Sequence, residues 1–172
     1  MRSDSSYKAC LLKTKVSKFT RSNKMKIYTT QFGEIEIHDD TVITFPTGIL
    51  GFPNFKKYAL IDVDESSPLK WLHSVEEPSL AFVVTDPNLF RPDYSIDAWK
   101  RDLADIDVTD AEEVIVLVLV TVPSEPSKMT ANLKGPVLIN TKNNMAKQLI
   151  VDNPDYDIKY RLLPDEVLEQ AI

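Results

Sequence analysis

The sequence is poor in the residues that most often build catalytic, metal and disulfide sites. Cys10 is its only cysteine, which excludes an internal disulfide and a zinc site built from cysteines. Its four glycines form neither a Walker loop nor a dinucleotide-binding fingerprint. The two histidines have no cysteine partners, and no nucleophile–base pair is recognisable. We therefore predict no catalysis, no metal and no cofactor, with His38 at a strand end and His73 half-buried and hydrogen-bonded.

The sequence also lacks an apolar run long enough to cross a membrane. The apolar segment Val114 to Val122 has only nine residues, whereas a spanning helix needs about 20. No segment near the start of the chain resembles the apolar region of a secretory signal. We therefore expect a cytoplasmic protein that makes no membrane contact.

Positive charge is scarce outside the first 24 residues. Residues 1–24 hold seven basic residues against one acidic residue, a net charge of +6. Since the whole chain carries −6, residues 25–172 must carry −12. A domain this acidic repels phosphate backbones and favours basic protein partners. Direct nucleic-acid binding is therefore not expected.

The composition changes abruptly at Met25, where a regular strand pattern begins. Three interpretations of residues 1–24 remain open: a disordered basic arm, an amphipathic transit peptide, or an extension upstream of the natural start. The third is favoured because Met25 directly precedes the pattern. We assign 1–24 to an extension outside the fold, 25–163 to one domain, and 164–172 to a tail that can form a frayed helix.

The segment from Glu113 to Asn140 is the predicted core of the fold. Its first part, 114–122, is rich in Val, Ile and Leu without charge, which is typical of a strand covered on both faces. Pro123 and Pro126 end that strand and force a turn. Residues 129–133 and 137–139 then resume the strand pattern, so we interpret the segment as a β-meander.

Short strand patterns recur along the rest of the chain, with turn signals about every eight to twelve residues. Ile96, Trp99 and Leu103 share one helical face, and Thr109 to Glu112 has a capping-box pattern. The sequence thus predicts an all-β fold, a small closed or partly open β-barrel-like domain with one or two short helices. The remaining predicted strands are 25–29, 34–38, 42–45, 58–63, 69–75, 80–85, 148–151 and 156–163.

An apolar segment lies between two glycines, Gly48 and Gly51. This spacing predicts a bend with unusual dihedral angles or a close approach of backbone. Ile49, Leu50 and Phe52 therefore lie in a bend and not within a strand. Two alternatives remain open: they leave apolar surface exposed for an amphipathic helix, or they plug the end of the barrel, which is slightly favoured.

Three stretches, taken together in this order and spacing, resemble the FliW family of bacterial flagellar assembly factors. They are F-P-T-G-I-L-G-F at 45–52, S-L-A-F-V-V-T-D-P at 79–87, and T-A-N-L-K-G-P-V-L-I-N at 130–140. Lys147-Gln148 follows them, and the resemblance covers about Met25 to Leu163. It implies a small β-barrel-like fold and a regulatory binding protein that is not an enzyme.

The resemblance also implies two protein partners. Members of this family bind flagellin in the cytoplasm, through the helical ends of flagellin. When flagellin is exported, they are free to bind CsrA, the carbon storage regulator, which is an RNA-binding translational repressor. CsrA bound in this way cannot hold the flagellin message, and flagellin synthesis resumes. We expect a monomer when free; the alternative is a flagellin-directed chaperone that acts without CsrA, and an unrecognised hydrolase is a distant third.

Candidate contact residues follow from expected exposure and not from the family pattern. Apolar contact with flagellin is assigned to the bend described above. The segment 62–65 and the turn 76–77 concentrate five acids expected to face the basic surface of CsrA. The alternative is that these acids only keep the protein soluble. The complete set of candidates is Ile49, Leu50, Phe52, Asp62, Asp64, Glu65, Glu76 and Glu77.

Overall fold

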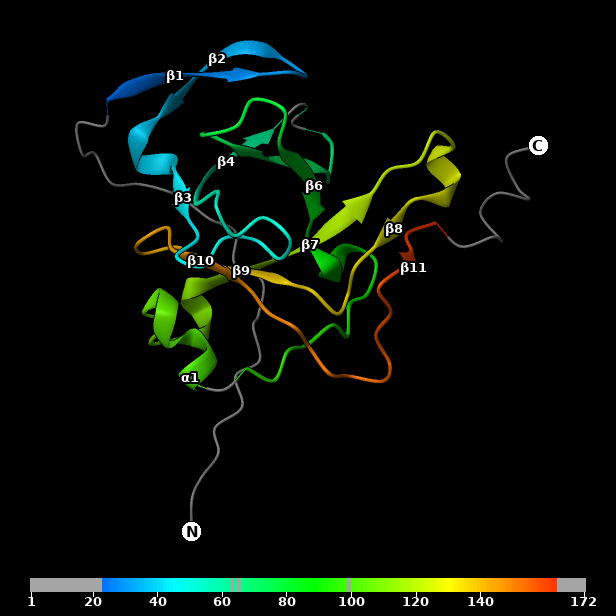
Figure 1. The fold of residues 1–172 in the computed structure, drawn as a ribbon. Helices are drawn as coiled ribbons and strands as arrows, with labels where there is room; N and C mark the ends of the chain where they lie inside the picture. The colour runs from blue at the N-terminus through cyan, green and yellow to red at the C-terminus, as the bar shows by residue number, and fades with distance from the viewer. Residues whose placement is uncertain (1–22, 63, 65, 99, 164–172) are drawn as a thin grey trace.

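A computed structural model describes residues 23–163 except 63, 65 and 99 (Figure 1). The predictions made for residues 1–22 and 164–172 lie outside these described residues. Eleven strands, one short α-helix and five 3₁₀ turns make up the regular structure of the described chain. The predicted all-β class is therefore confirmed. None of the described helices is both long and apolar enough to cross a membrane.

The described elements alternate short strands with single helical turns. The helical elements are η1 (Asp39–Thr41), η2 (Pro87–Leu89), α1 (Lys100–Leu103), η3 (Ala104–Ile106), η4 (Ala111–Glu113) and η5 (Pro126–Lys128). The strands are β1 (Lys24–Thr29), β2 (Gly33–His38), β3 (Ile43–Thr44), β4 (Lys57–Asp62), β5 (Lys70–Ser74), β6 (Ala81–Thr85), β7 (Val114–Thr121), β8 (Thr130–Ala131), β9 (Val137–Asn140), β10 (Ala146–Gln148) and β11 (Tyr160–Arg161).

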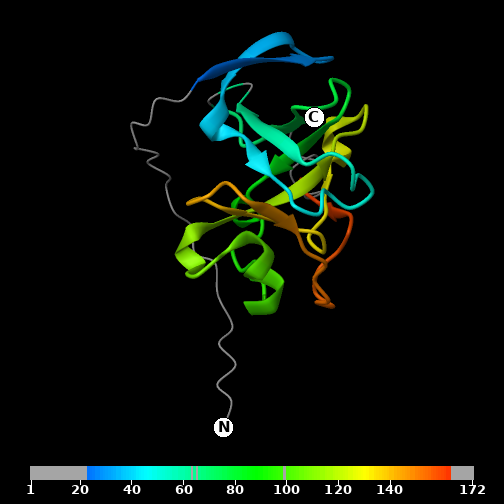
Figure 2. The same cartoon turned by 60° about the vertical axis from the view of Figure 1, so that its left-hand side comes forward.

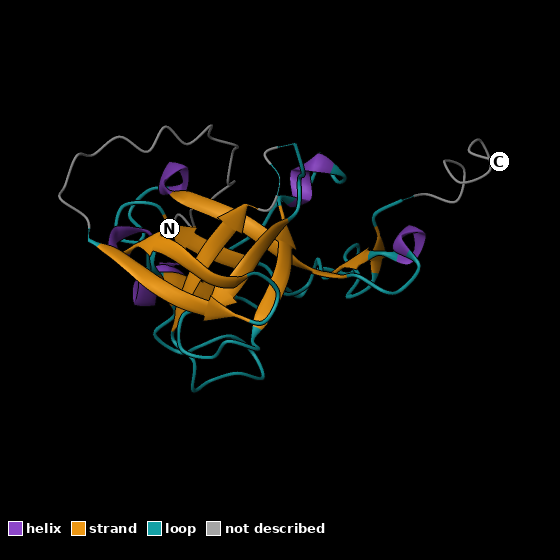
Figure 3. Cartoon of the chain, turned by 90° about the horizontal axis from the view of Figure 1, so that it is seen from above, coloured by secondary structure: helices purple, strands orange, loops and turns teal. Residues whose placement is uncertain are grey.

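Nine of the strands form one sheet that curls into a partly open barrel. The strand order is β10-β9-β7-β6-β5-β4-β3, with β8 and β11 attached beside β7. The two end strands approach each other at a single parallel bridge between Thr44 and Met145, where the Thr44 N–H donates to the Asn144 carbonyl at 2.8 Å. Figure 3 shows the strands of this barrel crossing one another. One bridge replaces a full ladder, so the barrel is not closed.

Strand β7 is the central strand, and both of its faces are covered. Successive side chains of a strand point to opposite faces. Accordingly, Ile115, Leu117 and Leu119 contact the apolar cluster inside the barrel. Val118 and Val120 belong to a second cluster, formed with the segments that cover the outside of the sheet. The prediction of a strand buried on both sides is confirmed.

The predicted β-meander is wrong in its pairing. Strands β8 and β9 do not pair with each other; both pair with β7, β8 through Val120↔Ala131 and β9 through Leu117↔Val137. They are two halves of one partner strand, interrupted by a bulge at 132–136. Within the bulge, the Asn132 side chain accepts the Lys134 N–H at 3.1 Å, and Pro136 has no N–H to give to a ladder.

Two helical predictions also need correction. Helix α1 spans only Lys100–Leu103, and Ile96 precedes it in irregular chain, although Ile96 and Leu103 are buried in the same outer cluster. Trp99 lies outside the described residues. At η4 the cap is Asp110, which accepts the Glu112 N–H. Thr109 instead donates to the Glu113 carboxylate, so the pattern was displaced by one residue.

The predicted strand 156–163 is much shorter in the structure, because side-chain contacts hold part of this segment outside the sheet. The closing strand is reduced to β11, because the Tyr156 side chain packs inward and its hydroxyl donates to the Ser95 carbonyl at 2.8 Å. The hairpin β1–β2 forms a separate two-stranded sheet on the opposite side of the barrel from α1 (Figure 1). Ile27 and Thr29 are its buried side chains.

Two buried tyrosines allow a matched test of the cores. The Tyr58 hydroxyl, inside the barrel, has no hydrogen-bond partner among the described residues, and burial raises its pKa to about 12. The Tyr94 hydroxyl, in the outer cluster, donates to the Leu133 carbonyl at 2.8 Å. An unpaired buried hydroxyl costs free energy, whereas a paired one contributes about 1 kcal/mol.

We therefore expect Tyr58→Phe to raise the free energy of unfolding by about 1 kcal/mol and Tyr94→Phe to lower it by about the same amount. Phenylalanine at position 58 keeps the edge-to-face contact with Phe45, whose ring centroid lies 5.2 Å away. Urea denaturation of both variants measures the two changes. Loss of stability in Tyr58→Phe would contradict the assignment of an unpaired hydroxyl.

Candidate functional site

The apolar bend after β3 is a hydrogen-bonded turn of unusual backbone geometry. The Phe52 N–H donates to the Ile49 carbonyl at 2.7 Å, and Gly51 has a φ of +87°, as the third position of a type II turn requires. Gly48 has a φ of +76°, and a Cβ atom there would lie 2.7 Å from the Phe52 carbonyl oxygen. Both predicted features of this segment, the unusual dihedrals and the close approach, are confirmed.

The three apolar side chains of the bend divide between the barrel and solvent. Ile49 is 2% exposed and belongs to the cluster inside the barrel. Leu50 is 54% exposed and Phe52 38% exposed, the Phe52 ring resting edge-on against Phe82 with centroids 5.2 Å apart. Each alternative therefore holds for part of the bend: Ile49 plugs the barrel, while Leu50 offers apolar surface.

The exposed bend lies at the open side of the barrel, beside β10. In Figure 2 the cyan segment that follows β3 runs close to the orange strand β10. The Leu50 N–H donates to Gln148 Oε1 at 3.0 Å, and Gln148 Nε2 donates to the Gly135 carbonyl at 3.0 Å. Ile150, two residues further along, is 78% exposed. We call the surface of Leu50, Gln148 and Ile150 the seam surface.

Sequence reasoning missed this surface. The resemblance included Gln148 without a role, and residues 148–151 were predicted as a strand, whereas β10 ends at Gln148. Strand alternation places Ile150 on the same face as Gln148, while Leu149 and Val151 pack against the outer cluster, so the exposure of Ile150 could have been predicted from the pattern.

The acidic segment 62–65 is partly a strand and not wholly a loop. Asp62 is the last residue of β4, opposite Lys70 in the β5 register, and its carboxylate pairs with the Lys70 ammonium. This position agrees with the predicted strand 58–63, and Asp62 does not belong to the loop that follows β4. Asp64 accepts the Ser66 N–H at 2.9 Å, and this bond lowers the pKa of its carboxyl. Glu65 lies outside the described residues.

The turn at 76–77 is held by its own carboxylates. Glu76 accepts the Lys56 and Lys57 N–H groups at 2.6 and 2.9 Å, and these bonds lower the pKa of the Glu76 carboxyl, with Lys57 the larger cause. Glu77 accepts from the Ser79 hydroxyl and N–H at 2.6 and 3.0 Å. Since these donors are neutral, these hydrogen bonds do not pair either carboxylate with a cation, whereas the Asp62 carboxylate is paired with the Lys70 ammonium.

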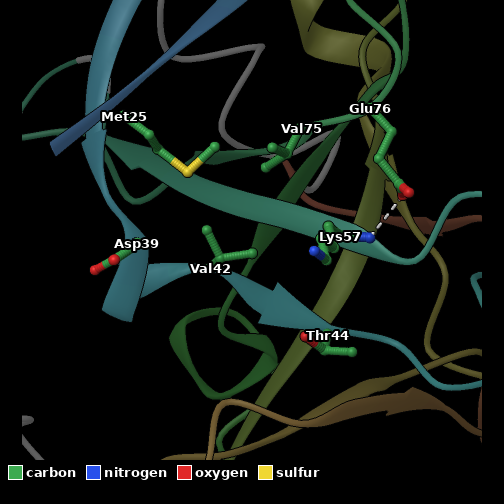
Figure 4. A pocket seen from close by; sticks show the side chains of 7 residues that line it. All are labelled: Met25, Asp39, Val42, Thr44, Lys57, Val75 and Glu76. Carbon is green, nitrogen blue, oxygen red and sulfur yellow. Dashed lines mark hydrogen bonds between the residues drawn. The ribbon is translucent and has the colours of Figure 1, made fainter. Parts of the chain in front are cut away.

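A cleft of about 450 Å³ lies between the β1–β2 hairpin and β3–β4 (Figure 4). Asp39 and Glu76 stand on different sides of it, and both accept backbone N–H groups, that of Asn23 in the case of Asp39. Its lining residues are Met25, Asp39, Val42, Thr44, Lys57, Val75 and Glu76.

The histidines and carboxylates of the described residues form no metal-binding group. No three His, Cys, Asp or Glu side chains are placed there to hold a metal ion. His73 is fully buried, and not half-buried as expected. Its Nδ1 lies 2.7 Å from the Ser74 carbonyl, which accepts an N–H from the ring, so the side chain is hydrogen-bonded as predicted; Nε2 lies 3.3 Å from the Gln31 side-chain amide. His38 is the last residue of β2, a strand end as expected.

Comparison with known proteins gives the same family from sequence and from structure. The sequence model described as FliW protein matches residues 26–162. A flagellar assembly factor FliW from Natranaerobius thermophilus is 44% identical over 143 residues, covering 83% of this chain and 95% of that protein. One from Leptospira interrogans is 40% identical over 146 residues, covering 84% of this chain and 97% of that protein.

A solved structure agrees with these sequence matches. The crystal structure of the flagellar assembly factor FliW matches with a TM-score of 0.76 and 36% identity, covering 81% of this chain and 98% of that one. The resemblance carried by the three sequence stretches is thereby confirmed. The partly open barrel, whose central strand is buried on both faces, is therefore the fold of a known family. The chain belongs to the FliW family.

Proposed function

We propose that this chain is a cytoplasmic regulatory binding protein of flagellar assembly. It binds flagellin and, when free of flagellin, binds CsrA and prevents it from repressing translation. Flagellin synthesis is thereby coupled to export. The observation that carries the proposal is the match to flagellar assembly factors over more than four fifths of the chain. The free protein is a monomer of one domain, predicted as residues 25–163 and extended by Lys24 of β1, and it acts by binding without catalysis.

The apolar bend supports the flagellin contact. An amphipathic helix binds by placing its apolar stripe in an apolar surface. Leu50 is more than half exposed, while its neighbour Ile49 anchors the turn inside the barrel. The proposal therefore assigns direct contact to Leu50 and Phe52, and a structural role to Ile49.

The charge distribution supports the CsrA contact. Residues 25–172 carry a net charge of −12, which favours a basic partner and repels RNA phosphates near it. Asp64, Glu76 and Glu77 accept from neutral donors, so these hydrogen bonds do not offset their negative charges with a cation. Asp62 is paired with a lysine and contributes least to the field.

The alternative is a flagellin-directed chaperone that acts without CsrA. The apolar contact is common to both functions, whereas the acidic surface matters only if CsrA is a partner. Measuring each contact with its own variants separates the two functions.

We expect Leu50→Asp to weaken flagellin binding by at least about tenfold, because a charged side chain loses the apolar contact and must be desolvated. Isothermal titration of purified flagellin measures the affinity. The free energy of unfolding should change by less than about 0.5 kcal/mol, as for most surface substitutions. Ile49→Asp is the matched control and should unfold the protein, since its side chain is buried. Unchanged affinity in a folded Leu50→Asp variant would remove Leu50 from the interface.

We expect the triple variant Asp64→Asn, Glu76→Gln, Glu77→Gln to associate with CsrA about tenfold more slowly at low ionic strength. The amides keep the acceptor oxygens of the turns but remove three negative charges. Stopped-flow kinetics at increasing salt should bring variant and wild type together, because salt screens surface charge.

The matched control is Asp62→Asn with Lys70→Gln, which removes an ion pair without changing the net charge. Its association rate should equal that of the wild type. Equal rates for the triple variant at low salt would exclude these carboxylates from steering. A wild-type protein that binds flagellin but not CsrA would establish the chaperone alternative.

A further inference from the structure

The barrel has one incomplete junction, between the end strands β3 and β10. In the described part of the chain, their backbones meet at the single bridge from Thr44 to Met145. Beyond that bridge, the chain after β3 turns away through the bend at 48–52. The connection back to β10 is then made by a side chain, because the Gln148 amide reaches the Leu50 backbone.

The turn itself leaves a backbone donor for this contact. In a hydrogen-bonded β-turn, the internal bond uses the carbonyl of the first residue and the N–H of the fourth. Here those groups belong to Ile49 and Phe52. The N–H of the second residue, Leu50, therefore needs a partner outside the turn, and Gln148 Oε1 accepts it at 3.0 Å.

The orientation of the Gln148 amide is fixed by its two contacts. Its oxygen faces a donor, the Leu50 N–H, and its nitrogen faces an acceptor, the Gly135 carbonyl. A flipped amide would place donor against donor and acceptor against acceptor. One side chain thus joins the bend after β3, strand β10 and the bulge between β8 and β9.

Gly135 provides the space for this arrangement. A Cβ atom at position 135 would lie 2.8 Å from Asn132 Nδ2 and 3.1 Å from Gln148 Nε2. A larger residue would therefore displace the amides that pack there. The bulge at 132–136 and the hydrogen bond between Leu50 and Gln148 therefore both depend on the small size of Gly135.

We propose that Gln148 is a positioning residue for the partner-binding turn. Its amide holds the Leu50 backbone while Ile49 anchors inside the barrel, so that the Leu50 side chain is presented to solvent in one orientation. Ile150, two residues after Gln148, lies on the same side of the extended chain and adds exposed apolar surface. This inference rests on the proposed contact between Leu50 and flagellin, and the partner chemistry it fits is the apolar stripe of an amphipathic helix.

A preformed turn lowers the entropy lost when a partner binds. If the two hydrogen bonds of the Gln148 amide are removed, the affinity for flagellin should therefore fall only because the Leu50 side chain is no longer held in one orientation. We expect Gln148→Leu, which keeps the side-chain size but neither hydrogen bond, to reduce flagellin affinity about five- to tenfold. In a Leu50→Ala background, the same substitution should change the affinity less than about twofold, since coupled residues are not additive.

A second readout does not require flagellin. Amide hydrogen exchange of the free protein should be about tenfold faster at Leu50 in Gln148→Leu than in the wild type, with exchange at Val118 in β7 unchanged. Gln148→Glu is a further variant that keeps the acceptor for Leu50 but cannot donate to Gly135. We expect it to lie between the wild type and Gln148→Leu in both measurements.

Equal losses of affinity in the wild-type and Leu50→Ala backgrounds would overturn the positioning role. Unchanged exchange at Leu50 would overturn the hydrogen bond between Leu50 and Gln148 itself. Failure of the wild-type protein to bind flagellin would instead refute the proposed function, while the exchange measurement would still decide whether Gln148 holds the turn. The two failures are therefore distinguishable.

Discussion

The fold depends on the need to cover both faces of β7. This strand carries no charge and is built almost wholly from Val, Leu and Ile, each of which contributes about 1.5–3 kcal/mol when fully buried. The sheet covers one face by curling into a barrel, whose interior holds Leu117. The other face, with Val118, is covered by the segments around α1 and β11. Neither layer could be removed without exposing half of the central strand.

Curling the sheet over one face of β7 also creates the surface that we propose to bind flagellin. It brings β3 beside β10, but the bend at 48–52 prevents a ladder between them, and a glutamine side chain takes its place. Leu50 lies at this junction and is more than half exposed. The carboxylates at 76–77 lie on another loop, so the proposed apolar and electrostatic contacts use separate parts of the fold.

The sequence predicted what depends on local pattern. The nine uncharged residues 114–122 indicated a strand buried on both faces, and Gly48 and Gly51 indicated a turn with unusual dihedral angles. It could not show that the Asp62 carboxylate pairs with Lys70, because that ion pair depends on the register between β4 and β5. Nor could it show that Gln148 bonds Leu50, because the two residues are 98 positions apart and the contact exists only in the folded barrel.

The central claim is that flagellin binds at the seam surface and the adjoining bend. Hydrogen–deuterium exchange of the full chain, with and without flagellin, tests it directly. The account predicts added protection at residues 48–52 and 148–150, with little change at Asp64 and Ser66 or in β7, which is paired with strands on both sides. Protection confined to the β1–β2 hairpin or to the cleft beneath it would contradict the claim.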